Sequence, residues 1–163
     1  MRFDIDEKPI QQLLLDPNNY RFRDLTQWRT RQYNRFHNQS VQESTLRLFE
    51  SVPRYNLNEL RQSILANGYI RLERIVIAPY EHADNYYLVI EGNRRVAALK
   101  TLLRDNNDGV LSLTPEQIED FTTVPVAILD PQEDELISAT RIIMGIRHIA
   151  LDHRNGVLTS KLY

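Results

Sequence analysis

The stretch Tyr86–Leu103, YYLVIEGNRRVAALKTLL, predicts the fold of this chain because it reads as a strand that passes directly into a helix. Tyr86–Ile90 is rich in aromatic and β-branched residues and has the length of a buried strand. Apolar residues then recur at helical spacing on one face, at Val96, Leu99, Leu102 and Leu103. The strand therefore gives way to the helix at Glu91–Asn93.

A helix that begins at this junction leaves its first backbone N–H groups without intrahelical partners, and its dipole is positive at Gly92–Arg95. Gly92 permits close approach of a ligand to the backbone, and Asn93 is a candidate helix cap. Arg94 and Arg95 add two guanidinium groups, which suit phosphate. The junction predicts a polyphosphate site. The alternative is an ordinary strand-to-helix turn with solvated arginines.

Residues 91–100, EGNRRVAALK, resemble the Gly-Glu-Arg-Arg-x-x-Ala box of the ParB family, whose N-terminal domain shares its fold with sulfiredoxin. Leu57–Ala78 is similar to the helix, glycine turn and strand that precede this box in the family, and Leu14–Arg21 is similar to its opening strand and turn. The resemblance implies an α+β fold with a small mixed sheet surrounded by helices. It implies one domain over residues 1–163, with a helical insertion at residues 24–51.

The resemblance also implies a function, namely binding of a nucleoside triphosphate, CTP or ATP, in a DNA-associated protein, with slow NTPase activity. Some relatives are ParB-like nucleases. The C-terminal DNA-binding and dimerisation domains of ParB are expected to be absent, because the chain ends at Tyr163. Two alternatives stay open. One is a DNA- or RNA-binding module or nuclease, and the other is a protein-interaction domain with a vestigial nucleotide site.

Composition narrows these classes. The chain has 163 residues, of which 42% are hydrophobic, enough for one domain with a core. It has no cysteine, which excludes disulfides and thiol chemistry. Sulfiredoxin relatives carry a cysteine where this chain has Asn93, so that redox branch is excluded. No apolar run approaches membrane-spanning length and Arg2–Lys8 is charged, so we expect a cytoplasmic protein without a membrane partner, and an oligomer stays possible.

The carboxylate beside the two arginines, Glu91, is the candidate catalytic base. Further along, Arg141–Asp152 lies where ParB carries a Glu-Asn-x-Gln-Arg box. By simple placement, Met144 and Gly145 replace the Glu and Asn associated with the nucleotide's magnesium. Neither side chain offers the oxygen ligands that Mg²⁺ prefers, so a magnesium requirement is in doubt and no metal-binding residue is assigned.

The same comparison with the Glu-Asn-x-Gln-Arg box places Arg147 and His148 near the family's Gln-Arg. The resulting candidate set for nucleotide phosphates is Gly92, Asn93, Arg94, Arg95, Arg147 and His148. A structural helix end that carries an arginine and a histidine is the alternative for the last two.

A second candidate surface is the segment Tyr20–Gln39, which interleaves arginines with aromatic side chains. Arginine contacts phosphate and stacks on bases, and aromatic rings stack on bases as well, so the segment is a candidate nucleic-acid surface. Its arginines are Arg21, Arg23, Arg29, Arg31 and Arg35. The favoured alternative is an amphipathic helix whose aromatics pack on the domain, because the net charge of the chain is −2.

The remaining pattern predicts short strands and helices in the family's order. Ile10–Leu15, Arg74–Pro79, Tyr86–Glu91 and Val124–Leu129 are expected to be strands, the last three in one sheet. Pro125 predicts that its strand lies at an edge or has the proline near its start. The expected helices are Val41–Ser51, Leu57–Asn67, the central helix from Asn93, a short helix from Thr114, and Pro131–Ala150.

Overall fold

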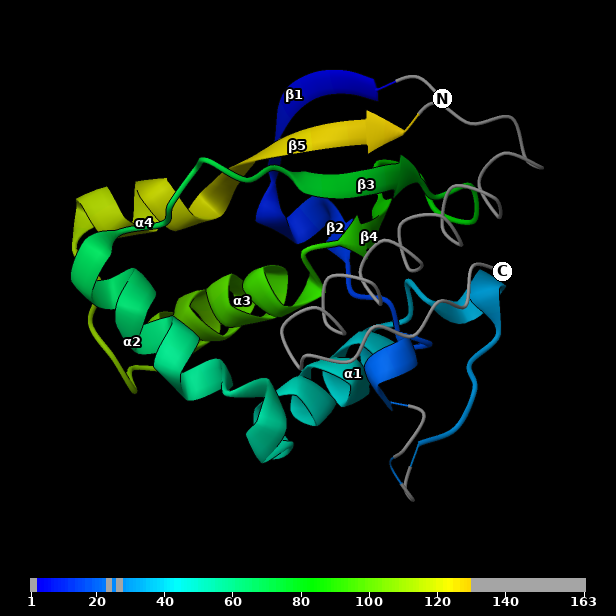
Figure 1. The fold of residues 1–163 in the computed structure, drawn as a ribbon, viewed down its shortest axis with the longest axis horizontal. Coiled ribbons are helices and arrows are strands. Elements are labelled where there is room, and N and C mark those ends of the chain that lie inside the picture. Colours follow the sequence, from blue (N-terminus) through cyan, green and yellow to red (C-terminus); the bar gives the residue numbers. More distant parts are fainter. Residues whose placement is uncertain (1–2, 23–24, 26–27, 130–163) are drawn as a thin grey trace, which may run out of the picture.

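The structure is a computed structural model that describes residues 3–22, 25 and 28–129 (Figure 1). These residues form five strands and four α-helices, with four short 3-10 turns between them. The strands are β1 (Phe3–Pro9), β2 (Leu13–Leu14), β3 (Ile75–Pro79), β4 (Tyr87–Glu91) and β5 (Thr123–Leu129). The helices are α1 (Gln39–Ser51), α2 (Leu57–Asn67), α3 (Asn93–Asn107) and α4 (Pro115–Thr122). The 3-10 turns are η1 (Ile10–Gln12), η2 (Tyr20–Phe22), η3 (Tyr33–Arg35) and η4 (Pro53–Tyr55).

All five strands belong to one mixed sheet in the order β1-β5-β3-β4-β2. β3 and β4 form an antiparallel hairpin, and β5 runs parallel to β3. β1 pairs antiparallel with β5, and β2 pairs parallel with β4. The α+β class, the mixed sheet and the sharing of one sheet by the three predicted strands are confirmed.

The central helix α3 packs through the face that the sequence indicates. Val96, Leu99 and Leu102 are fully buried, and Leu103 is partly buried. Small side chains between them, Ala97 and Ala98, are buried too, which lets α3 lie close to its neighbours. Figure 1 shows α1, α2 and α3 gathered on one side of the sheet, so α3 lies between the sheet and the outer helices.

The start of the chain differs from the prediction. The expected strand Ile10–Leu15 is a 3-10 turn followed by the two-residue strand β2, and the long strand is β1, which precedes it. β1 is a largely exposed edge strand, and its short apolar alternation of Phe3 and Ile5 stops at Asp6, so the sequence pattern does not indicate a strand there. β5 therefore lies inside the sheet, and Pro125 is near its start. Pairing with β3 begins only at Val126, so the missing N–H of Pro125 costs no bond to that strand.

Between Tyr20 and Gln39 the described residues form only the short turns η2 and η3, so the helix of the amphipathic-helix alternative is wrong for them. The packing that this alternative expected is confirmed for Phe22 and Phe36, which are buried in hydrophobic clusters. α1 begins only at Gln39 and covers the end of the proposed 24–51 insertion, which itself stays a prediction. The expected helix Pro131–Ala150 lies outside the described residues. No helix in the described part is long and apolar enough to cross a membrane.

Candidate functional site

Gly92 links β4 to α3 in a conformation that favours glycine. Its φ is 104° and its ψ is 16°, a left-handed geometry that costs other residues energy. A Cβ at this position would lie 2.6 Å from Cδ1 of Ile75 and 3.2 Å from Nη2 of Arg95. Backbone conformation and close packing therefore both require a glycine here.

The N-terminus of α3 presents free backbone donors. The first bond of the helix runs from the amide of Val96 to the carbonyl of Gly92, at 3.0 Å. The amides of Asn93, Arg94 and Arg95 precede it and have no intrahelical acceptor, and no side chain among the described residues caps the helix. The positive end of the helix dipole and three N–H groups thus lie at one point, an arrangement suited to an anion.

Asn93 does not cap the helix, so that prediction is wrong. Gly92 is the cap residue and Asn93 is the first helical residue, so its side chain turns back into the protein and is only 1% exposed. Its Nδ2 donates to the carbonyl of Val89 at 3.1 Å, and its Oδ1 accepts from the amide of Asp16 at 2.9 Å. The side chain of Asn93 is therefore not available to a ligand.

Arg94 reaches the start of α2. Its Nε donates to the carbonyl of Tyr55, and its Nη2 donates to the carbonyl of Asn56 at 2.9 Å. Burial lowers the pKa of Arg94, and the nearby charge of Arg21 lowers this pKa further. Both acceptors are neutral, so the positive charge of Arg94 is not cancelled by its hydrogen-bond partners.

Arg95 points to a different segment. Its Nη1 donates to the carbonyl of Glu73 at 2.8 Å, and its Nη2 lies 3.9 Å from the Glu73 carboxylate. The Glu73 side chain is 84% exposed, so this ion pair is weak. The two arginines hold opposite ends of the segment from Tyr55 to Glu73, instead of both pointing into one pocket.

A pocket of about 290 Å³ adjoins Arg95. Its lining is mainly apolar and includes Leu60, Ile64, Tyr69 and Leu72. Tyr69 is 7% exposed, and its buried hydroxyl has no hydrogen-bond partner among the described residues. Burial raises the pKa of this hydroxyl, while the charge of the Arg95 guanidinium and its close approach to the oxygen act in the opposite direction.

The other predicted residues are spread more widely. Glu91 is the last residue of β4 and is half-buried. Arg21 lies near Arg94, whereas Arg29 and Arg31 line a second pocket, against α1. Arg35 is exposed at the end of η3. Arg23, Arg147 and His148 lie outside the described residues.

Two residues near this site were not found from the sequence. Asp16 contributes the backbone amide that anchors Asn93, and burial raises the pKa of its own carboxyl to about 6. Tyr69 supplies the unpartnered hydroxyl. In the sequence, the Asp16-Pro17 and Gly68-Tyr69 pairs indicate only turns, because nothing local reveals which distant groups a turn contacts.

In the described part of the chain, no group of three or more His, Cys, Asp or Glu side chains could hold a metal.

Comparison with known proteins places the chain in a family. Residues 26–142 match the family described as the ParB N-terminal domain. The chain belongs to this family. No curated protein matches the chain. Among solved structures, this ParB N-terminal domain is similar to a C-terminally truncated chromosome-partitioning protein ParB from Caulobacter crescentus, complexed with CTP-gamma-S. Sequence identity is 18% and the TM-score is 0.42, over 88% of this chain and 53% of that one, so the chain spans about half the length of that protein.

Proposed function

We propose that this ParB N-terminal domain binds a nucleoside triphosphate at the junction of β4 and α3. The phosphates contact the free amides of Asn93, Arg94 and Arg95, and the base enters the apolar pocket beside Arg95. The observation that carries the proposal is that the first three amides of α3 have no intrahelical acceptor, in a turn that also carries Arg94 and Arg95. Family membership supports it, because the resemblance to ParB implies a nucleotide, CTP or ATP.

The charge balance at the junction favours phosphate. Arg94 donates only to neutral carbonyl oxygens, and Arg95 adds one weak, exposed ion pair. A guanidinium bonded to an ionised oxygen forms a stronger hydrogen bond than one bonded to a neutral carbonyl. Arg94 uses Nε and Nη2, and its Nη1 has no partner among the described residues. A phosphate would therefore gain a charged donor without displacing the contacts that hold α2.

The pocket beside Arg95 fits a base. Its volume of about 290 Å³ is near the lower end of ligand pockets. Its apolar walls suit the faces of an aromatic ring, and the Ser63 side chain offers a polar contact to the ring edge. The pocket shares Arg95 with the phosphate site, so one molecule could occupy both.

Calorimetric titration with each of the four ribonucleoside triphosphates, with and without Mg²⁺, tests this proposal. We expect one nucleotide, CTP or ATP, to bind more tightly than the others, since the pocket wall contacts the base. We also expect weak dependence on Mg²⁺, because Met144 and Gly145 replace the family's magnesium-associated residues. Failure of all four to bind at millimolar concentration would refute the proposal.

Hydrolysis is a separate part of the proposal. Glu91 is the carboxylate that adjoins the phosphate site in sequence, so we propose it as the general base for slow turnover. Glu91→Gln should then abolish phosphate release while nucleotide affinity is retained. Equal release by the wild type and the variant would remove Glu91 from this role.

A further inference from the structure

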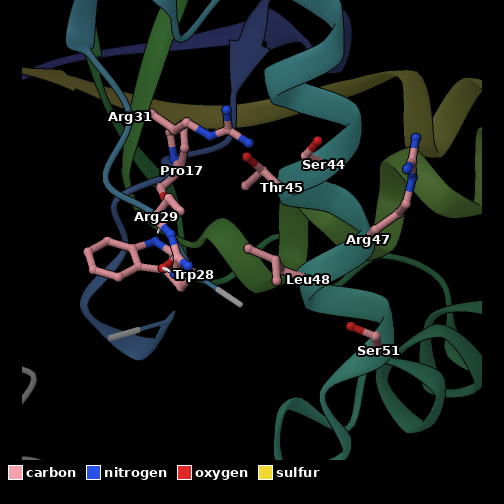
Figure 2. Close-up of a pocket in the computed structure, with 9 residues that line it drawn as sticks. All are labelled: Pro17, Trp28, Arg29, Arg31, Ser44, Thr45, Arg47, Leu48 and Ser51. Atoms are coloured by element: carbon pink, nitrogen blue, oxygen red, sulfur yellow. Dashed lines mark hydrogen bonds between the residues drawn. The ribbon is translucent and has the colours of Figure 1, made fainter. Parts of the chain in front are cut away.

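A second pocket lies between α1 and the segment Trp28–Arg31, which we call the strap (Figure 2). Its volume is about 280 Å³, and it shares no lining residue with the pocket beside Arg95. Three arginines line it, Arg29, Arg31 and Arg47, and none of its described lining residues is acidic. The pocket therefore presents concentrated positive charge on a chain whose net charge is −2.

The strap is held by the turn that precedes it. The indole Nε1 of Trp28 donates to the carbonyl of Pro17 at 3.0 Å. The side chain of Asn18 bonds the backbone of Arg31 twice, accepting from its amide at 2.8 Å and donating to its carbonyl at 2.9 Å. The wall that carries Arg29 and Arg31 thus has a defined position although it contains no helix or strand.

The Arg31 side chain has no competing partner in the part of the chain that the structure describes. Figure 2 shows it extending from the strap toward α1, near Thr45. Its guanidinium makes no hydrogen bond or ion pair with any described residue, and the residue is exposed. Arg47 has only an exposed pair with Glu43 among these residues, at 3.8 Å. At least these two cations are therefore available to an anion at no cost in strong interactions.

The opposite wall is one face of α1. Ser44, Leu48 and Ser51 lie four and three residues apart, so they share a helix face, and all three line the pocket. Each serine hydroxyl can donate to a phosphate oxygen, but the two lie about 10 Å apart along the helix, so one phosphate contacts one of them. Leu48 supplies an apolar patch between them. On the strap side, Trp28 contributes the aromatic surface of the pocket.

We propose that this pocket binds one nucleotide unit of a single-stranded nucleic acid. Its phosphate lies among Arg29, Arg31 and one serine hydroxyl of α1, and its base stacks on Trp28. Non-specific binders of single strands combine cationic grooves with aromatic stacking surfaces, and this pocket contains both. A paired base inside a duplex cannot reach the indole, so single strands are the expected ligand.

The fluorescence of Trp28 tests the proposal directly, because the chain contains one tryptophan. Titration with an oligothymidylate at about 50 mM salt should quench this fluorescence, and the affinity should fall steeply as salt rises. Absence of any fluorescence change at low salt would overturn the proposal.

Arg31→Ala should weaken oligonucleotide binding by about tenfold, which corresponds to the removal of one charged hydrogen bond. The salt dependence should flatten by about 0.7 in log–log slope for each phosphate that the variant no longer neutralises. The melting temperature should not change, because the Arg31 guanidinium holds no other described part of the protein. The matched control is Arg74→Ala, an exposed arginine directly before β3 that does not line the pocket. It should bind like the wild type.

Two outcomes contradict a single-strand site. Equally weakened binding by Arg31→Ala and Arg74→Ala would mean general electrostatic attraction. Quenching of Trp28 by inorganic phosphate or a free mononucleotide, as tight as that by the oligonucleotide, would mean a small phosphorylated ligand.

Discussion

The side chain of Asn93 accepts a hydrogen bond from the backbone amide of Asp16 at 2.9 Å, across 77 positions of sequence. The same side chain donates to the carbonyl of Val89 at 3.1 Å. Through these two bonds the first residue of α3 is fixed to the strand before it and to the turn after β2. The N-terminus of α3, with its free amides, is therefore held in place by a buried amide.

Asn93→Ala should lower the free energy of unfolding by about 2–3 kcal/mol. The substitution leaves the amide of Asp16 without its acceptor, and an unsatisfied buried group costs about 1–3 kcal/mol. Urea denaturation measures the change. Asn58→Ala, at an exposed position of α2, is the matched control and should change stability by less than about 0.5 kcal/mol. An Asn93→Ala protein as stable as the control would show that the bond to Asp16 contributes nothing.

Gly92→Ala should destabilise the protein through both conformation and contact. The left-handed backbone costs about 1–2 kcal/mol for a residue with a Cβ, and the new methyl would meet Cδ1 of Ile75 at 2.6 Å. Ile75→Val removes that Cδ1 atom. We therefore expect Gly92→Ala to cost less in the Ile75→Val background than in the wild type, as a double-mutant cycle would measure. Equal costs in the two backgrounds would mean that the contact with Ile75 contributes nothing, and would leave backbone strain and the contact with Arg95 as the causes.

Asp16 gives stability a dependence on pH. Burial raises the pKa of its carboxyl from 3.8 to about 6 in the native state. Between these values the native state binds more protons than the unfolded state, so the free energy of unfolding falls as pH rises through this window. Asp16→Asn keeps an oxygen acceptor for the amide of Asn18 and removes the charge.

This variant should be more stable than the wild type by about 2–3 kcal/mol at pH 7–8, and equally stable below about pH 4. Denaturation curves across this pH range measure the difference. A constant difference at all pH values would mean that the carboxyl of Asp16 titrates normally.

Local patterns predicted the centre of the fold. The strands β3, β4 and β5 and the helix α3 have periodic apolar residues and clear turns, so their types followed from the sequence. The strand β1 could not be predicted in this way, because its pairing with β5 depends on backbone hydrogen bonds and leaves its side chains exposed.

In the candidate site too, features set by local sequence could be predicted and features set by distant contacts could not. Gly92 and the two arginines could be placed at a helix N-terminus from their order alone. The directions of the arginines could not be predicted, because Arg94 and Arg95 bind carbonyls of Tyr55, Asn56 and Glu73, which only the fold brings near. Asn93 was misassigned for the same reason, since its partner Asp16 is remote in sequence.

The most direct test of the nucleotide proposal is the triphosphate affinity of Arg94→Ala and Arg95→Ala, measured by calorimetry beside the wild type and Arg74→Ala. Each of the first two variants should lose about 1.5–3 kcal/mol of binding free energy, the value of a charged hydrogen bond. Arg74→Ala should bind like the wild type. Because both site arginines also hold backbone carbonyls, melting curves must show that each variant is folded at the titration temperature. Triphosphate binding of wild-type strength by folded Arg94→Ala and Arg95→Ala would contradict the assignment of the phosphates to the N-terminus of α3.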